Sequence, residues 1–336
     1  MKRLKRIFAV FFCLLLASGI LGGCGKAASS SAPAPSASQS GSKPLKIVTT
    51  IFPEYDWVRE ILGDRADHAE VTMLLDNGVD LHSYQPTADD IIKISDCDLF
   101  IYVGGESDGW VEDALKEAAN KDMQGINLLA VLGEQVKGEE VVEGMEAEEE
   151  ESEDEDEPEY DEHVWLSLKN AETLCNAITD ALEEIDPANK DAYAANAASY
   201  LEKLAALDGE YQAVVDNAVR KTVLFGDRFP FRYLVDDYGL SYYAAFAGCS
   251  AETEASFETI SFLAGRVDEL GLPCVLTIEG AQHKIAETIV QNSAAKNQSI
   301  LTLDSMQSTT SADAANGRTY LSVMESNLDV LKQALN

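Results

Sequence analysis

The chain of 336 residues has only four histidines, and two of them occupy positions where they could bind a metal ion. His82 lies in "DNGVDLHSYQPT", whereas His163 stands between an acidic run and the apolar "VWL". A single histidine near a turn is more often a surface residue, so neither one is convincing alone. Two imidazoles that meet carboxylates would suit a divalent transition metal, because imidazole favours zinc and oxygen ligands admit manganese.

Candidate carboxylates follow β-branched runs in the second half of the chain. They are Asp227 in "LFGDRF", Glu279 in "LTIEG" and Asp304 in "LTLDS". Ligands of open parallel sheets bind beyond the carboxyl ends of the strands, and His82 and His163 also follow predicted strands. These five side chains are therefore predicted to face one cleft, although Asp304 could equally be an ordinary helix cap. The other two histidines, His68 and His283, are expected to face solvent.

Two similar lobes are predicted to position these residues. Short β-branched runs alternate with helical patterns in residues 44–185 and again in 220–336, four runs in each half. The runs are "KIVTTI", "AEVTMLL", "LFIYVGG" and "INLLAVL", then "TVLFG", "SYYAAF", "CVLTIEG" and "SILTL". This alternation predicts an α/β fold in which each lobe has a four-stranded, mainly parallel sheet flanked by helices.

One long helix is predicted to join the lobes over residues 186–219. Asp186 and Pro187 suit an N-cap and first helical position, and apolar residues recur afterwards at steps of three and four. A helix of about eight turns would be a stiff connection, with the ligand cleft between the two lobes.

The N-terminus has the features of a targeting segment. Basic residues precede a short apolar stretch and then "LGGC", which resembles the lipobox of bacterial lipoproteins. We expect residues 1–23 to be a signal peptide and residues 24–43 to comprise a lipidated Cys24 and a flexible tether; a plain secretory signal is the alternative. The protein is therefore expected outside the cytoplasm, anchored by lipid to the cell membrane.

Negative charge dominates the sequence, with 59 acidic against 25 basic residues and a formal net charge of −34. Such a chain repels nucleic acid and attracts cations. The acidic run at 138–160 is expected to be a disordered loop that concentrates divalent ions, or else a merely solvated insertion. Four cysteines follow the tether, without a C-x-x-C pair, and their disulfide state is open: Cys97, Cys175, Cys249 and Cys274.

Several segments resemble the solute-binding lipoproteins of ATP-driven zinc and manganese importers. The most specific are "LHSYQPT" and "DEHVWLSL", and the resemblance extends to the C-terminal "YLSVMESNLDVLKQAL". It implies one metal ion bound between two lobes, with His82, His163 and Asp304 as ligands. The family's third ligand falls on Arg228, which cannot bind a cation. Asp227 could replace it and Glu279 could contribute; the alternative is that Arg228 pairs with a carboxylate while water completes the site.

The resemblance implies a receptor, without catalysis, that captures zinc, or alternatively manganese, and delivers it to an ABC-type membrane permease. We expect a monomer. A metal-dependent surface adhesin or scaffold, and a siderophore or corrinoid receptor of similar architecture, are the alternatives. A metallohydrolase is disfavoured because the sequence lacks the H-E-x-x-H motif of zinc-dependent hydrolases.

Overall fold

The computed structural model describes residues 43–146, 160–250, 254–280 and 283–336. The predicted signal peptide, Cys24 and the tether lie outside the described residues, as does the middle of the acidic run, 147–159. Residues Pro44–Asn336 form one compact unit. Within the described residues, no helix combines the length and apolar character needed to cross a membrane.

The first lobe is built on a four-stranded sheet in the order β2-β1-β3-β4, and all of its strand pairs are parallel. The strands are β1 Lys46–Thr49, β2 Glu70–Met73, β3 Leu99–Tyr102 and β4 Gln124–Asn127. The helices are α1 Phe52–Leu62, α2 Ala88–Ser95, α3 Val111–Lys116 and α4 Leu128–Leu132. The predicted fourth strand continued to residue 132, but Asn127 ends it because its side chain accepts a hydrogen bond from the Ala130 amide and caps α4.

The second lobe repeats this topology with the order β6-β5-β7-β8, again all parallel. Its strands are β5 Thr222–Arg228, β6 Ser241–Phe246, β7 Cys274–Thr277 and β8 Ser299–Thr302. Its helices are α7 Arg232–Tyr238, α8 Phe257–Leu270, α9 Lys284–Asn292, α10 Ser311–Ala315 and α11 Tyr320–Leu335. The predicted α/β class with two similar parallel sheets is confirmed.

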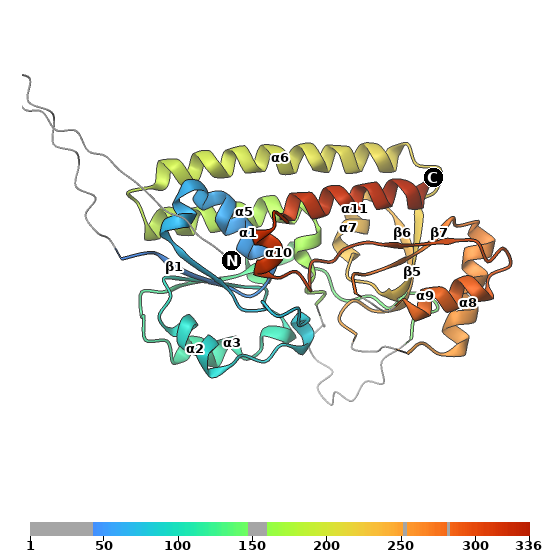
Figure 1. Ribbon diagram of the computed structural model, residues 1–336, viewed down its shortest axis with the longest axis horizontal. Helices are drawn as coiled ribbons and strands as arrows, with labels where there is room; N and C mark the ends of the chain where they lie inside the picture. Colours follow the sequence, from blue (N-terminus) through green and yellow to red (C-terminus); the bar gives the residue numbers. More distant parts are fainter. Residues whose placement is uncertain (1–42, 147–159, 251–253, 281–282) are drawn as a thin grey trace, which may run out of the picture. The chain divides into compact units, whose positions relative to one another are not determined.

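The connecting helices differ in detail from the prediction. Helix α5, Leu168–Ile185, ends at Asp186, and the long helix α6 spans Lys190–Asp216. Asp186 is therefore a C-cap rather than an N-cap, and its carboxylate accepts hydrogen bonds from Asn189 and Tyr193 at 2.6 and 2.8 Å. Figure 1 shows α6 extending along both lobes, with α5 and α11 in the layer next to it.

Helix α11 belongs to both lobes, although residues 220–336 were all assigned to the second one. Its first residue, Tyr320, donates its amide to Asp56 at 2.8 Å and its hydroxyl to the Trp165 carbonyl at 2.7 Å. The Tyr320 ring also lies edge-on to Trp57, with the ring centroids 5.2 Å apart. Contacts from α11 to the first lobe thus supplement the α6 connection, which favours a stiff arrangement over wide hinge closure.

Candidate metal centre

His82 lies in a short 3-10 helix, Leu81–Ser83, in the segment that follows β2. The Asp80 carboxylate caps this turn by accepting the His82 amide at 3.0 Å. The ring Nδ1 lies 2.8 Å from the Ser107 hydroxyl and 3.5 Å from a carboxylate oxygen of Glu162. These contacts hold the ring through Nδ1 and leave Nε2 as the atom available to an ion.

His163 is completely buried and immediately precedes the 3-10 helix Val164–Leu166. The Asp161 carboxylate accepts both its amide, at 2.9 Å, and its Nδ1, at 3.0 Å. Asp161 is itself fixed, because the Tyr233 hydroxyl donates to its carbonyl at 2.8 Å. A proton held on Nδ1 by a carboxylate leaves the Nε2 lone pair for a metal ion, as in carboxylate–histidine–zinc arrangements.

The two Nε2 atoms lie only 3.2 Å apart, although 81 positions separate the residues in the chain. Burial lowers the pKa of His82 to about 3, and the charge of His163 adds to the shift. His82 is therefore neutral at physiological pH, the state in which imidazole binds metals. Two Nε2 atoms that converge in a buried place could bind one cation between them, which would displace any proton that they share.

Cys249 completes a group of three potential ligands. Its Sγ and one ring nitrogen each of His82 and His163 all lie within 4.8 Å of one another, the one such group of histidine, cysteine and acidic residues in the described parts of the chain. Cys249 follows β6, and its amide donates to Glu139 at 2.9 Å. Burial raises the pKa of its thiol, and the charge of Glu139 raises it further.

The sequence prediction omitted Cys249, although the strand-end rule could have found it. The residue comes three positions after the end of β6 in "FAGCS", as Asp227, Glu279 and Asp304 lie at the ends of their own strands. Cys249 is not in a C-x-x-C pair, the cysteine spacing that indicates a metal site in a sequence. All four cysteines of the described residues are free thiols.

Glycine at position 248 allows the cysteine loop to reach the buried imidazole. A Cβ added to Gly248 would lie 2.9 Å from the Phe229 carbonyl oxygen and 3.2 Å from two atoms of the His163 ring. Both distances are shorter than an ordinary van der Waals contact of a Cβ atom. The backbone next to Cys249 therefore packs directly on His163.

Asp227 and Arg228, at the family's third-ligand position, are engaged elsewhere. One Asp227 oxygen accepts the Arg228 amide at 3.0 Å, and the other accepts the Ile278 amide at 3.3 Å. The Arg228 guanidinium forms an ion pair with Asp80 in the first lobe. Burial raises the pKa of Asp227.

Glu279 organises the loop after β8. One of its oxygens accepts the Ser305 amide at 2.7 Å, and the other accepts the Ser305 hydroxyl at 2.8 Å and the Gln307 amide at 3.0 Å. Burial raises the pKa of Glu279, and the neighbouring charge of Asp304 adds to the effect. The Glu279 carboxylate therefore has a clear structural role.

The Asp304 carboxylate also interacts with other groups of the second lobe. One oxygen accepts the Met306 amide at 2.8 Å, and the other forms an ion pair with Arg318. The next residue links this loop to the first lobe, because the Trp165 indole donates to the Ser305 carbonyl at 2.9 Å. Asp304, Asp227 and Glu279 all lie outside the group of three described above.

The other two histidines differ from each other. His68 is exposed, as expected. His283 was also expected to face solvent, but it is half-buried, and its Nδ1 is buried without a hydrogen-bond partner among the described residues.

Residues 47–334 match the model of the family described as zinc-uptake complex component A, periplasmic. The chain belongs to this family. It is 32% identical over 289 residues to the zinc-binding lipoprotein AdcA of Streptococcus pneumoniae serotype 4, covering 86% of this chain and 55% of AdcA. It therefore spans about half the length of that relative. The high-affinity zinc uptake system protein ZnuA of Bacillus subtilis is 32% identical over 337 residues, 99% of this chain and 98% of ZnuA.

Solved structures of this family share the fold. The zinc-bound ZnuA-like domain of Streptococcus pneumoniae AdcA superposes with a TM-score of 0.67 at 30% identity, covering 87% of this chain and 99% of that domain. The metal-dependent lipoprotein YcdH of Bacillus subtilis superposes with a TM-score of 0.70 at 27% identity, covering 87% of this chain and all of that one.

The acidic run of this family member begins with an ordered segment, residues 139–146. Glu140 forms an ion pair with Arg232 and accepts the Tyr242 hydroxyl at 3.2 Å. Met145 is buried, and the Glu146 amide donates to a β6 carbonyl at 2.9 Å. Residues 139–146 of the predicted loop 138–160 thus include apolar and hydrogen-bonding groups that pack on the second lobe.

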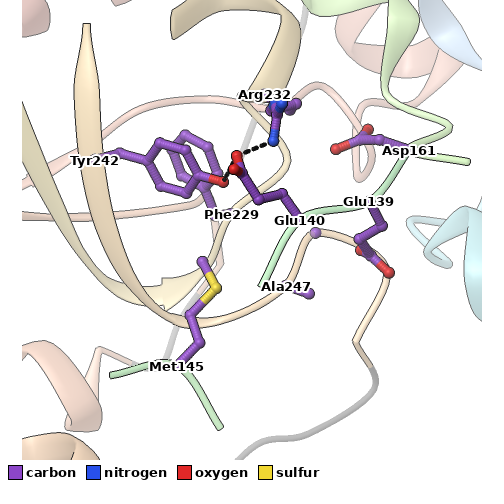
Figure 2. Close-up of a pocket in the computed structure, with 9 residues that line it drawn as sticks. Glu139, Glu140, Met145, Asp161, Phe229, Arg232, Tyr242 and Ala247 are labelled. Atoms are coloured by element: carbon purple, nitrogen blue, oxygen red, sulfur yellow. Dashed lines mark hydrogen bonds and ion pairs between the residues drawn. The ribbon is translucent and has the colours of Figure 1, made fainter. Parts of the chain in front are cut away.

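A pocket lies between this segment and the second lobe, next to the cysteine loop. Figure 2 shows Glu140 directed at Arg232 and Tyr242, whose ring stacks on Phe229 with 3.8 Å between centroids. The pocket is lined by Glu139, Glu140, Met145, Asp161, Phe229, Arg232, Tyr242, Ala247 and Gly248. The ordered segment thus covers the edge of the candidate metal centre.

Proposed function

We propose that this protein is an extracytoplasmic receptor that captures zinc and delivers it to an ABC-type membrane permease. The observation that carries the proposal is the pair of Nε2 atoms 3.2 Å apart on His82 and His163. Zinc-binding names of the relatives AdcA and ZnuA support zinc over manganese, the alternative ion. Imidazole ligands also favour zinc over manganese.

The distance between the two nitrogens suits one shared ion. Two imidazole nitrogens bound to one tetrahedral zinc at 2.0–2.1 Å lie about 3.3 Å apart. The two rings already have nearly this separation, so binding requires little movement in the first lobe. The Nδ1 contacts with Ser107 and Asp161 keep both rings in place before the ion arrives.

We further propose that the ion lies between the lobes and that Asp304 is its ligand from the loop after β8. Asp227 and Glu279 remain weaker candidates, since their oxygens already accept backbone amides. An ion held by several protein ligands between two lobes suits capture and release.

The proposed receptor is a monomer outside the cytoplasm. Residues 1–23 would be removed as a signal peptide, and the lipid on Cys24 would hold the protein at the membrane beside its permease. The lipobox-like "LGGC" supports this placement.

Isothermal titration of chelator-stripped protein tests the proposed function. We expect one site per chain that binds zinc more tightly than about 1 μM, or about −8 kcal/mol. His68→Ala is the matched control, because His68 is exposed and should leave this site unchanged. Absence of a saturable tight site in the wild-type protein would refute the receptor proposal.

A further inference from the structure

We propose that the Cys249 thiolate is a metal ligand that takes the place of the family's missing third ligand and makes the site selective for zinc over manganese. This inference rests on the proposed function, because it assigns a further ligand to the same ion. The resulting donor set is two imidazole nitrogens, one sulfur and the proposed carboxylate oxygen of Asp304.

The geometry of the three donors supports this assignment. In a tetrahedral zinc site the nitrogens lie about 3.3 Å apart, and each nitrogen lies about 3.6 Å from a bound sulfur. The ligand atoms of His82, His163 and Cys249 all lie within 4.8 Å of one another. A shift of the cysteine loop toward the two Nε2 atoms would complete such a triangle around one ion.

The cysteine loop is held at the site from two directions. Gly248 packs on the His163 ring so closely that a Cβ would crowd it, and Glu139 of the ordered acidic segment accepts the Cys249 amide at 2.9 Å. Main-chain contacts of this kind position the thiol, whose sulfur also interacts with Glu139 and with the backbone of Glu162. Cys249 therefore has the placed backbone that a metal ligand requires.

The other second-lobe candidates for the third ligand are less suitable than Cys249. Arg228 stands at the family position and pairs with Asp80, while both Asp227 oxygens accept backbone amides. A thiolate would restore the negative charge that a carboxylate ligand would have supplied. Its proton leaves to solvent when the ion binds.

Thiolate coordination has a consequence for metal choice. Sulfur is a soft ligand that favours zinc and cobalt, whereas manganese prefers oxygen ligands. A site with one thiolate and two imidazoles should therefore discriminate strongly against manganese. The discrimination should depend on Cys249 rather than on the histidines alone.

Titration with Co²⁺ tests the assignment directly, because a thiolate bound to cobalt gives a charge-transfer band in the near ultraviolet. We expect this band in the wild-type protein and in Cys274→Ala, a control at a buried cysteine outside the site. Cys249→Ser should lose the band. It should bind zinc only about 10- to 100-fold more weakly, because the serine oxygen can still approach the ion in place of the sulfur. Its affinity for manganese should change less, so that the zinc-to-manganese preference falls.

Two further measurements keep the test decisive if Cys249→Ser folds poorly. Saturating zinc should slow alkylation of Cys249 in the wild-type protein, as followed by peptide mass spectrometry. Gly248→Ala should weaken the cobalt band by pushing the loop from His163.

The possible failures are distinguishable. Tight binding of cobalt or zinc by the wild-type protein without a sulfur band, or without protection of Cys249, would overturn the thiolate assignment and leave the receptor function intact. Failure of the wild-type protein to bind either ion would refute the proposed function itself.

Discussion

The two lobes share one topology but present their polar strand-end residues in different states. In the first lobe, His82 and His163 are each held through Nδ1, and their Nε2 atoms converge at 3.2 Å. In the second lobe, the oxygens of Asp227 and Glu279 accept backbone amides, and Asp304 pairs with Arg318. The first lobe thus has two nitrogen donors that point toward one position. The carboxylates of the second lobe already accept hydrogen bonds or form an ion pair within the protein.

A position at the end of a strand is therefore not enough to make a carboxylate a metal ligand. A carboxylate there can equally satisfy the amides of the adjoining loop, which would otherwise be left unpaired. The second lobe brings a different group, the Cys249 loop, within reach of both imidazoles. We therefore expect the loss of zinc affinity to be largest when a first-lobe imidazole is replaced and smallest when the acidic run is deleted.

Replacing His163 by Ala should have the largest effect. Loss of a residue that only orients a ligand costs about 10- to 100-fold in metal affinity, so loss of the ligand itself should cost more than about 100-fold. Competitive titration against a chelator of known affinity would measure the change. An unchanged affinity would mean that the ion binds away from the two imidazoles.

Replacing Asp161 by Asn should have the next largest effect, a loss of about 10- to 100-fold in zinc affinity. The amide no longer provides the carboxylate that orients His163 through Nδ1 and its main-chain amide. Asp186→Asn is the matched control, since Asp186 lies at the end of α5 and pairs with Asn189 and Tyr193. Equal losses in both variants would contradict a specific role for Asp161.

Replacing Glu279 by Ala should reduce stability more than zinc affinity. The change removes the acceptor for the Ser305 and Gln307 amides, and each buried donor left unpaired costs about 1–3 kcal/mol. Denaturant unfolding of the metal-free protein would show the loss, while zinc titration of the folded fraction should show a smaller change than Asp161→Asn does. A larger loss of zinc affinity would instead identify Glu279 as a ligand.

Deleting residues 147–159 should have the smallest effect. The deletion removes most of the acidic run but retains Glu139, Glu140 and Met145, which contact the second lobe. We expect the tight site to be unchanged and only weak additional binding to disappear, because carboxylates in water hold divalent ions weakly. Titration at low and high ionic strength would distinguish the tight site from the weak additional binding. Loss of the tight site would show that the acidic run itself coordinates the ion.

Local patterns in the sequence determined the repeating units of the fold. Alternating β-branched runs and helical segments predicted two parallel sheets, since each pattern reflects the period of a single element. The capping of α2 by Thr87 and Asp90 was also predictable, because the two residues are three positions apart. The start of the long helix was not predictable in this way. Aspartate commonly caps the N-terminus of a helix, but Asp186 stands at the C-terminal end of α5.

The residue types and their place in the strand pattern also singled out His82 and His163, which the structure brings together. His82 follows β2 in the structure, whereas α4 and the acidic run separate His163 from β4. Only the tertiary structure decided which groups of the second lobe lie near these two histidines. Cys249 reaches His163 through Gly248 across 86 positions of sequence, while Glu279 bonds to a loop 26 positions away. Such pairings depend on how two loops pack in space, and the hydrophobic period of a strand or helix carries no information about them.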